Sequence, residues 1–231
     1  MSYIKLILLL IWSFLCIVIS MLLLVLTFTR SMPIKMARTI WAPGVFFIFG
    51  SKLKVSGLEN IERGKTYIIM ANHLSYLDIP SMFRALPLDL YFIAKKELKK
   101  TPFLGWYMMA VGMIFIDRKD PRKAQQSLKD AAEYIQGGKN VLIFPEGTIS
   151  VSGETMKFKK GGFHLALESG VEILPVALNG TNKIWPGDSN TNLKRGQVQV
   201  TVGKPISVKN FLKKDLSKLI TEVQEKVEVL I

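Results

Sequence analysis

The sequence predicts an α/β protein: a mostly parallel or mixed sheet covered by helices, with an N-terminal apolar helix as membrane anchor. From Lys52 onward, short apolar runs alternate with helical stretches, which is typical of this class. The runs at residues 67–71 (YIIMA) and 141–144 (VLIF) are apolar throughout, as expected of central strands buried on both faces. An uncharged run of 23 residues, Leu6–Phe28, precedes the alternating region.

As a helix, Leu6–Phe28 would be roughly 34 Å long, enough to cross a hydrocarbon core of about 30 Å. It is too long for the apolar region of a signal peptide, and no small-residue cleavage site follows it. We therefore expect it to stay attached as an anchor, with Cys16 as a packing residue within it.

The charges beside this run predict its orientation. Five cations occur between Arg30 and Lys54, before the first acidic residue, Glu59, whereas Lys5 is alone on the other flank. Loops rich in lysine and arginine remain in the cytoplasm. The sequence therefore predicts a protein of the inner membrane whose C-terminal part is cytoplasmic, and each cation near an anionic surface adds ~1 kcal/mol of attachment.

A second apolar patch, Thr39–Gly50, is too short to span a bilayer and contains Pro43 and Gly44. We expect an interfacial or re-entrant helix beside the first, with Trp41 near the headgroups. Its length fits a core helix equally well, and the sequence leaves open whether the first helix spans the bilayer or lies in one leaflet. Residues 1–50 are thus predicted to be membrane-associated, and residues 51–231 to form the folded domain.

The remaining elements follow from short β-branched or aromatic runs and from helix start and stop signals. Strands are predicted at residues 52–56, 66–71, 90–94, 113–116, 141–144, 173–178 and 197–202. Helices are predicted at residues 78–86, 105–110, 121–136, 161–168 and 210–230.

Composition limits the possible functions. A single cysteine excludes an intrachain disulfide, and two histidines without a cysteine cluster disfavour a zinc site, so we expect no metal. The net charge of +13 fits nucleic acid, anionic lipid, an acidic carrier or a phosphorylated substrate. No nucleic-acid recognition motif accompanies it. We therefore expect anionic membrane lipid as a partner and no nucleic acid.

The segment YIIMANHLSYLDIP, residues 67–80, places His73 and Asp78 five positions apart across a predicted strand-to-helix turn. On one helix these side chains would diverge by roughly 140°, but across a turn they can meet. An imidazole held by a carboxylate is the arrangement that activates a hydroxyl nucleophile. The alternative is structural: Asp78 as a helix cap, also in capping-box spacing with Ser75, and His73 as a core histidine.

Two further segments follow predicted strands, where open α/β sheets bind ligands. Glu146, Gly147 and Thr148 form a turn in which the glycine permits close backbone approach and the threonine offers a hydroxyl. Arg118 ends GMIFIDR, where its guanidinium could hold a phosphate through two hydrogen bonds. Judged on the residues alone, both segments could equally be ordinary turns.

NHLSYLD matches the N-H-x-x-x-x-D signature of the glycerolipid acyltransferases, and the chain resembles the 1-acyl-glycerol-3-phosphate (lysophosphatidic acid) acyltransferases. Further matches follow in the expected order over about residues 52–203: GMIFIDR, FPEGTIS, FKKGGFHLA and ILPVAL. The resemblance implies acyl transfer from acyl-CoA or acyl-acyl carrier protein, without a cofactor, to the 2-hydroxyl of lysophosphatidic acid, giving phosphatidic acid. It also implies that His73 is the general base, that Asp78 orients it, and that Arg118 and residues 146–148 bind the acceptor.

The chain departs from the family pattern E-G-T-R-S at one position, where Ile149 replaces the arginine. Phosphate recognition must then depend on Arg118 and on Lys157, Lys159 or Lys160, which precede a predicted helix start suited to an anion. Lys95 is a further candidate, facing headgroups or the donor. The substitution leaves another lysolipid acceptor open.

Four further points complete the expectations. His164, within FHLALE, is expected to be a buried structural histidine, and residues 101–106 (TPFLGW) to form either an apolar lip for an acyl chain or part of the core. No G-x-S-x-G motif occurs, which argues against an esterase of the α/β-hydrolase type. A different class, a non-enzymatic basic membrane adaptor, would detach from membranes and lose function at high salt.

Overall fold

The computed structural model describes residues 2–116, 121–188 and 192–231, and over these residues it confirms the predicted α/β class. The sheet has seven strands in the order β1-β7-β6-β2-β5-β3-β4. Their bounds are β1 (Lys52–Ser56), β2 (Ile68–Ala71), β3 (Leu90–Lys95), β4 (Ile114–Ile116), β5 (Asn140–Ile143), β6 (Ile173–Asn179) and β7 (Gln197–Val202).

The sheet is mixed. All neighbouring strands are parallel except β6 and β7, which are antiparallel. The central strand β2 is buried along its whole length. Strands β2 to β6 therefore end at one shared edge of the sheet, the edge at which open α/β sheets bind ligands.

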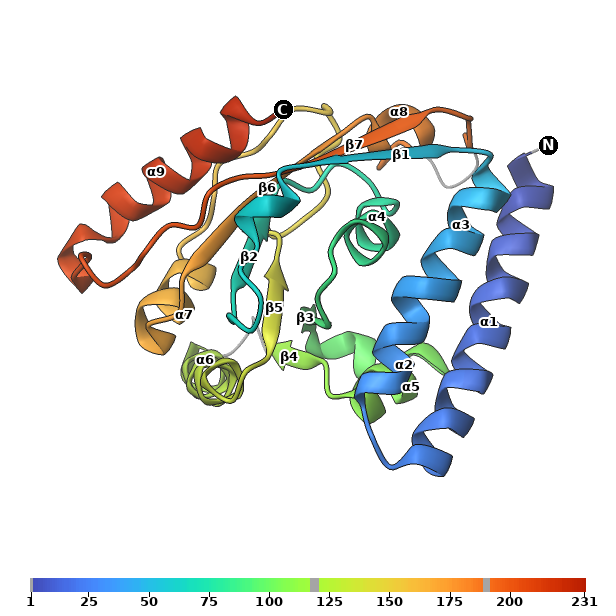
Figure 1. Ribbon diagram of the computed structural model, residues 1–231, viewed down its shortest axis with the longest axis horizontal. Helices are drawn as coiled ribbons and strands as arrows, with labels where there is room; N and C mark the ends of the chain where they lie inside the picture. The colour runs from blue at the N-terminus through green and yellow to red at the C-terminus, as the bar shows by residue number, and fades with distance from the viewer. Residues whose placement is uncertain (1, 117–120, 189–191) are drawn as a thin grey trace.

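Helices cover both faces of the sheet (Figure 1). Their bounds are α1 (Ser2–Thr27), α2 (Ser31–Met36), η1 (Ala37–Trp41), α3 (Ala42–Phe49), η2 (Leu58–Asn60), α4 (Asp78–Ala85), η3 (Lys96–Lys100), α5 (Leu104–Val111), α6 (Pro121–Gln136), α7 (Gly161–Ser169), α8 (Thr181–Ile184), η4 (Lys213–Asp215) and α9 (Leu216–Val229). The N-terminal helices and α4 lie on one side of the sheet, and α6, α7 and α9 lie on the other (Figure 1). The helix predicted from residue 210 begins only at Leu216.

The N-terminal helices form a hairpin in which α2, η1 and α3 run back alongside α1 (Figure 1). Trp12 Nε1 donates to the carbonyl oxygen of Trp41 at 3.0 Å, and Trp41 Nε1 donates to Ser13 Oγ at 3.1 Å. The second helix thus packs beside the first, as expected. The helical path continues through residues 43 and 44 to Phe49.

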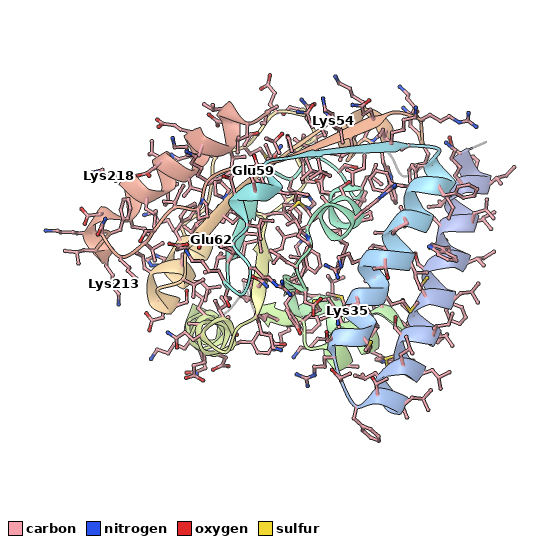
Figure 2. The ribbon with its side chains drawn as sticks, viewed as in Figure 1. Lys35, Lys54, Glu59, Glu62, Lys213 and Lys218 are labelled. Carbon is pink, nitrogen blue, oxygen red and sulfur yellow. The ribbon has the colours of Figure 1, made fainter. Side chains whose placement is uncertain are left out.

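The outer side of α1 is apolar and exposed. This helix is long and apolar enough to cross a membrane, and we use "apolar face" for its exposed apolar residues together with Phe103, Leu104, Trp106 and Met109 at α5. The Phe14 and Phe103 rings, 5.1 Å apart, join the two parts. Figure 2 shows Lys213 and Lys218 on the opposite side of the molecule. Residues 103, 104 and 106 are therefore surface residues, and the core alternative for them is wrong.

Helix α4 links the hairpin to the sheet. The Trp41 and Phe83 rings are 5.9 Å apart, and the Arg84 guanidinium lies 4.7 Å from the centre of the Phe46 ring. The helix that begins at Asp78 therefore rests on the hairpin. The division into segments at residue 50 stays a prediction.

Candidate active site

The site begins where the chain leaves β2. Asn72 is buried, and its side chain donates to the carbonyl oxygen of Leu178 at 2.9 Å and accepts from the amide of Leu178 at 2.7 Å. Through these two side-chain bonds, Asn72 stays attached to β6 one residue beyond the end of β2. The backbone that carries His73 is thereby fixed at the edge of the sheet.

The structure brings the side chains of His73 and Asp78 together, with Nδ1 of the histidine 2.8 Å from Oδ2 of the aspartate. The same oxygen accepts the amides of Leu74 at 2.7 Å and Ser75 at 2.8 Å. Because Asp78 is fully buried and its Oδ2 is already an acceptor, Nδ1 carries the hydrogen of the third bond. The His73 side chain remains 14% exposed.

This geometry replaces the structural alternative for Asp78. The aspartate is the first residue of α4, and its carboxylate binds amides that precede it in the chain instead of capping the helix. The Ser75 hydroxyl is also committed, since it donates to the Trp185 carbonyl oxygen at 2.6 Å and accepts the Leu77 amide at 3.0 Å. The bonds around Asp78 therefore shape the turn that presents His73.

A second turn, residues 144–150 after β5, holds His73 from the other side. The Phe144 ring stacks on the imidazole, with centroids 4.0 Å apart and planes 12° apart. The Ser150 amide donates to the His73 carbonyl oxygen at 2.8 Å. Sequence reasoning missed both contacts, and the only signal for them was that the FPEGTIS segment also follows a strand.

Glu146 is buried behind this turn. One of its carboxylate oxygens accepts the His73 amide at 2.8 Å, and the other accepts the Met156 amide at 3.2 Å. Burial raises the pKa of this carboxyl, and the two amide bonds oppose the shift. Glu146 thus supports the histidine backbone, while its binding of substrate stays a prediction.

Cations lie around the same edge. Gly147 has a φ of 77°, and a Cβ on it would stand 2.9 Å from Lys159 Nζ, so the ammonium group packs on the turn. The backbone amide of Lys159 also donates to the Pro145 carbonyl oxygen at 2.9 Å. Lys160 and Thr148 are exposed beside it.

Lys95 is exposed at the end of β3, pairs with Ile116 of β4 and therefore also lies at this edge. Arg118 lies outside the described residues. The predicted contacts of Lys95 and of the residues around Gly147 with substrate stay predictions.

The structure also places Ile149 and His164. Ile149 packs against Gly187, so an apolar contact occupies the position of the family arginine. His164 is exposed on α7, and the expectation that it is a buried structural histidine is wrong. The apolar residues of its helix, Phe163 and Leu165, face the core instead.

The family model described as Acyltransferase matches residues 52–179. The chloroplastic 1-acyl-sn-glycerol-3-phosphate acyltransferase of Arabidopsis thaliana is 38% identical over 168 residues, covering 72% of this chain and 47% of the relative. The 1-acyl-sn-glycerol-3-phosphate acyltransferase of Saccharomyces cerevisiae is 37% identical over 183 residues, covering 78% of this chain and 60% of the relative. The chain thus spans about half the length of the curated relatives it matches.

Among solved structures, the 1-acyl-sn-glycerophosphate acyltransferase PlsC of Thermotoga maritima aligns with a TM-score of 0.82 at 29% identity, covering 100% of this chain and 98% of that one. The family match spans the turn that carries His73 and the turn that carries Glu146. The predicted family is confirmed: the chain belongs to the acyltransferase family.

Proposed function

We propose that this chain transfers a fatty acyl group from an acyl thioester to the 2-hydroxyl of 1-acyl-glycerol-3-phosphate, giving phosphatidic acid. The observation that carries the proposal is the 2.8 Å bond between His73 Nδ1 and the buried Asp78 carboxylate at the ligand-binding edge of the sheet. The names of the relatives supply the reaction class.

In this proposal His73 is the general base. Nδ1 is occupied by Asp78, so Nε2 takes the proton of the acceptor hydroxyl as its oxygen attacks the thioester carbonyl carbon. The carbon–sulfur bond of the resulting intermediate then breaks, and the proton passes from Nε2 to the departing sulfur. Asp78 stabilises the positive imidazolium in between. The substrate supplies the attacking oxygen, so no serine or cysteine nucleophile and no cofactor is required.

The cations of the same edge suit the acceptor phosphate. Lys159, packed on the turn at Gly147, and the exposed Lys160 and Lys95 provide positive charge at the same edge of the sheet as His73, and we assign Arg118 the same role from its motif. Gly147 and Thr148 form the wall of this acceptor site, and the buried Glu146 supports that wall from behind. Because Ile149 provides no charge, a second lysolipid with a less acidic headgroup is the alternative acceptor.

The two histidines of the chain provide a matched test. His73→Ala should lower turnover in detergent micelles by ~10²–10⁴, whereas His164→Ala, on the exposed face of α7, should leave it unchanged. The assay measures turnover for every pairing of two acceptors with two donors. The acceptors are lysophosphatidic acid and an uncharged-headgroup lysolipid, and the donors are acyl-CoA and acyl-acyl carrier protein. Near-wild-type turnover in His73→Ala would remove this residue from the mechanism.

We also propose that α1 lies within the cytoplasmic leaflet instead of crossing the bilayer. The helix runs alongside α2–α3, and α3 leads directly into β1 (Figure 1). If α1 crossed the bilayer, the start of β1 and the sheet beside it would be drawn into the hydrocarbon core. Unpaired polar groups are costly there. Embedding only the apolar face avoids that cost, and the cations after residue 29 select the cytoplasmic side.

Single cysteines at positions 2 and 29, on a Cys16→Ala background, test this placement in sealed vesicles of known orientation. A membrane-impermeant maleimide should label both positions from the same, cytoplasmic side. Labelling of the two positions from opposite sides would show a spanning helix.

A further inference from the structure

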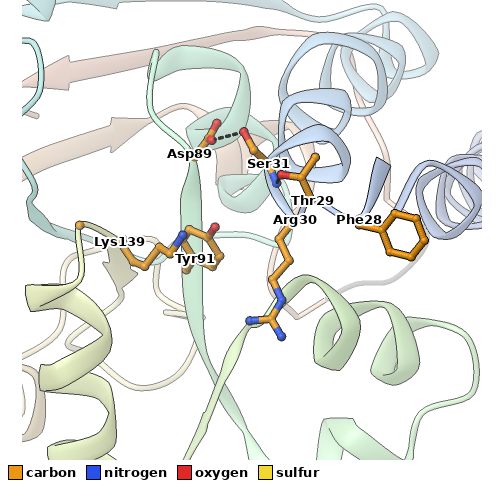
Figure 3. A pocket seen from close by; sticks show the side chains of 8 residues that line it. Phe28, Thr29, Arg30, Ser31, Asp89, Tyr91 and Lys139 are labelled. Carbon is orange, nitrogen blue, oxygen red and sulfur yellow. Dashed lines mark hydrogen bonds between the residues drawn. The ribbon is translucent and has the colours of Figure 1, made fainter. Parts of the chain in front are cut away.

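A hollow of about 500 Å³ lies at the other end of the parallel strands, away from His73. Its lining comes from the residues after α1, from the start of β3 and from the start of β5, and includes Arg30, Asp89 and Lys139 (Figure 3). Strand starts and strand ends occupy opposite edges of this sheet. The hollow is therefore separate from the site built around His73.

The hollow is positively charged. Arg30 and the half-buried Lys139 both line it, and within residues 2–116, 121–188 and 192–231 no carboxylate lies within ion-pairing distance of either. Figure 3 shows Tyr91 between these two cations, and Lys139 Nζ lies 5.3 Å from the centre of its ring. The Arg30 guanidinium lies beside Gly112 and the Tyr134 hydroxyl, so the two cations lie on different sides of the Tyr91 ring in the wall of one hollow. A hollow lined by two cations favours an anion.

One carboxylate, Asp89, also lines the hollow, and its Oδ2 accepts the Ser31 hydroxyl at 2.8 Å (Figure 3). Two cations and one carboxylate leave a net charge of +1 in the lining. This charge balances the single negative charge of a phosphodiester better than the larger charge of a phosphomonoester.

The position of the hollow indicates where such a phosphodiester comes from. The hollow opens where α1 ends, and Phe28, which also lines it, is 91% exposed. The φ of Phe28 is 52°, which is costly for an aromatic residue. Lipid would bury this exposed ring, since the phenylalanines of interfacial helices lie at the boundary between headgroups and acyl chains. Arg30 and Lys139 would then lie at the level of the lipid phosphates.

We propose that this hollow binds the phosphodiester headgroup of an anionic bilayer lipid, whose acyl chains lie along α1. Arg30 and Lys139 hold the phosphate, and the Ser31 hydroxyl and Asp89 lie beside it. The bound lipid is neither acceptor nor product of the proposed reaction. It fixes the end of α1 and the adjacent edge of the sheet at the membrane surface.

The test measures lipid retained by the full chain in neutral detergent micelles, by native mass spectrometry with added phosphatidylglycerol or phosphatidylcholine. Lys139→Gln should weaken phosphatidylglycerol binding by about fivefold, as expected for loss of one charge near a lipid phosphate. Lys129→Gln, an exposed lysine of α6 outside the hollow, is the matched control. Equal binding by the two variants would overturn the proposal.

Two further arms test the ligand. Asp89→Asn, which keeps an oxygen acceptor for Ser31, should strengthen phosphatidylglycerol binding, whereas weakening would contradict the charge argument. Inorganic phosphate should not displace the lipid at equal concentration; if it does, the hollow is a free-anion site and the lipid assignment fails. Because the readout is binding, it is independent of the proposed function. Turnover of Lys139→Gln in neutral micelles should equal that of the wild type.

Discussion

The turn from His73 to Asp78 and the apolar face of α1 are stabilised in opposite ways. In the turn, one buried oxygen of Asp78 accepts three hydrogen bonds, and the histidine backbone is bonded to the next turn at both its amide and its carbonyl. On the apolar face, large side chains such as Leu22 and Trp106 are 56% and 54% exposed. Specific bonds fix the turn, whereas total apolar area determines the affinity of the face for lipid. Single substitutions should therefore affect chemistry in the first region and partitioning in the second.

The sharpest change to the turn is Asp78→Asn, which keeps the shape and an acceptor oxygen but removes the charge that stabilises the imidazolium. Turnover in micelles should fall by ~10²–10⁴, with the thermal unfolding midpoint little changed. Asp215→Asn is the matched control, because Asp215 also accepts a backbone amide, that of Leu212 at 3.0 Å. An unaffected turnover would mean that the carboxylate is only structural.

On the apolar face, Leu22→Asp should weaken vesicle binding by up to about 10²-fold, because an aspartate in the apolar part of a membrane costs up to about 3 kcal/mol. Vesicle flotation measures the binding, and turnover in detergent micelles should persist. Leu212→Asp, at an exposed leucine outside the apolar face, should float like the wild type. If both variants float equally, α1 does not enter the bilayer.

Glu146→Gln weakens the support of the turn without touching the imidazole. The amide has one acceptor oxygen for two backbone donors, so kcat should fall by about tenfold, in line with one lost hydrogen bond, while KM for the acceptor stays constant. Glu154→Gln, on the exposed part of the same loop, should be silent. A raised KM with unchanged kcat would instead favour substrate binding by Glu146.

The same variant has a pH signature. Folding raises the pKa of Glu146 above the ordinary value of 4.5, so the folded chain holds this proton more tightly than the unfolded chain. The contribution of the group to stability therefore declines as pH rises from 4.5 through the raised value. Urea unfolding at several pH values should show this decline in the wild type relative to Glu146→Gln. A difference independent of pH would contradict the raised pKa.

The smallest effect concerns acceptor choice. Ile149→Arg restores a cation beside the proposed phosphate site and should lower KM for lysophosphatidic acid by up to about fivefold, the range of an exposed ion pair. KM for an uncharged-headgroup lysolipid should stay the same, which provides the internal control. An equal change for both acceptors would argue against a phosphate at this position.

The sequence predicted what depends on local pattern. The bounds of β1, β7 and α6 agree with the predicted ranges, and the spacing of His73 and Asp78 indicated a turn that could join them. Tertiary contacts explain the failures. His164 is exposed because Phe163 and Leu165 take the core-facing positions of α7. Gly44 lies against the indole of Trp12 with no room for a Cβ, a close approach that no local pattern indicates.

The supports of the site were less accessible from the sequence. Stacking by Phe144 and the inward carboxylate of Glu146 depend on β2 and β5 being neighbours, which no local pattern specifies. The start of α9 was predicted too early, because residues 213–215 form a separate short turn in which Leu212 bonds to Asp215.

The central claim is that Asp78 keeps a hydrogen on Nδ1 of His73 and so leaves Nε2 as the base. The chain has two histidines, so in the His164→Ala variant the ¹⁵N spectrum of the imidazole belongs to His73 alone. Under alkaline conditions we expect an Nδ1–H signal and an unprotonated Nε2, and Asp78→Asn should reduce this preference. A hydrogen on Nε2 in the otherwise wild-type protein would contradict the proposed general base.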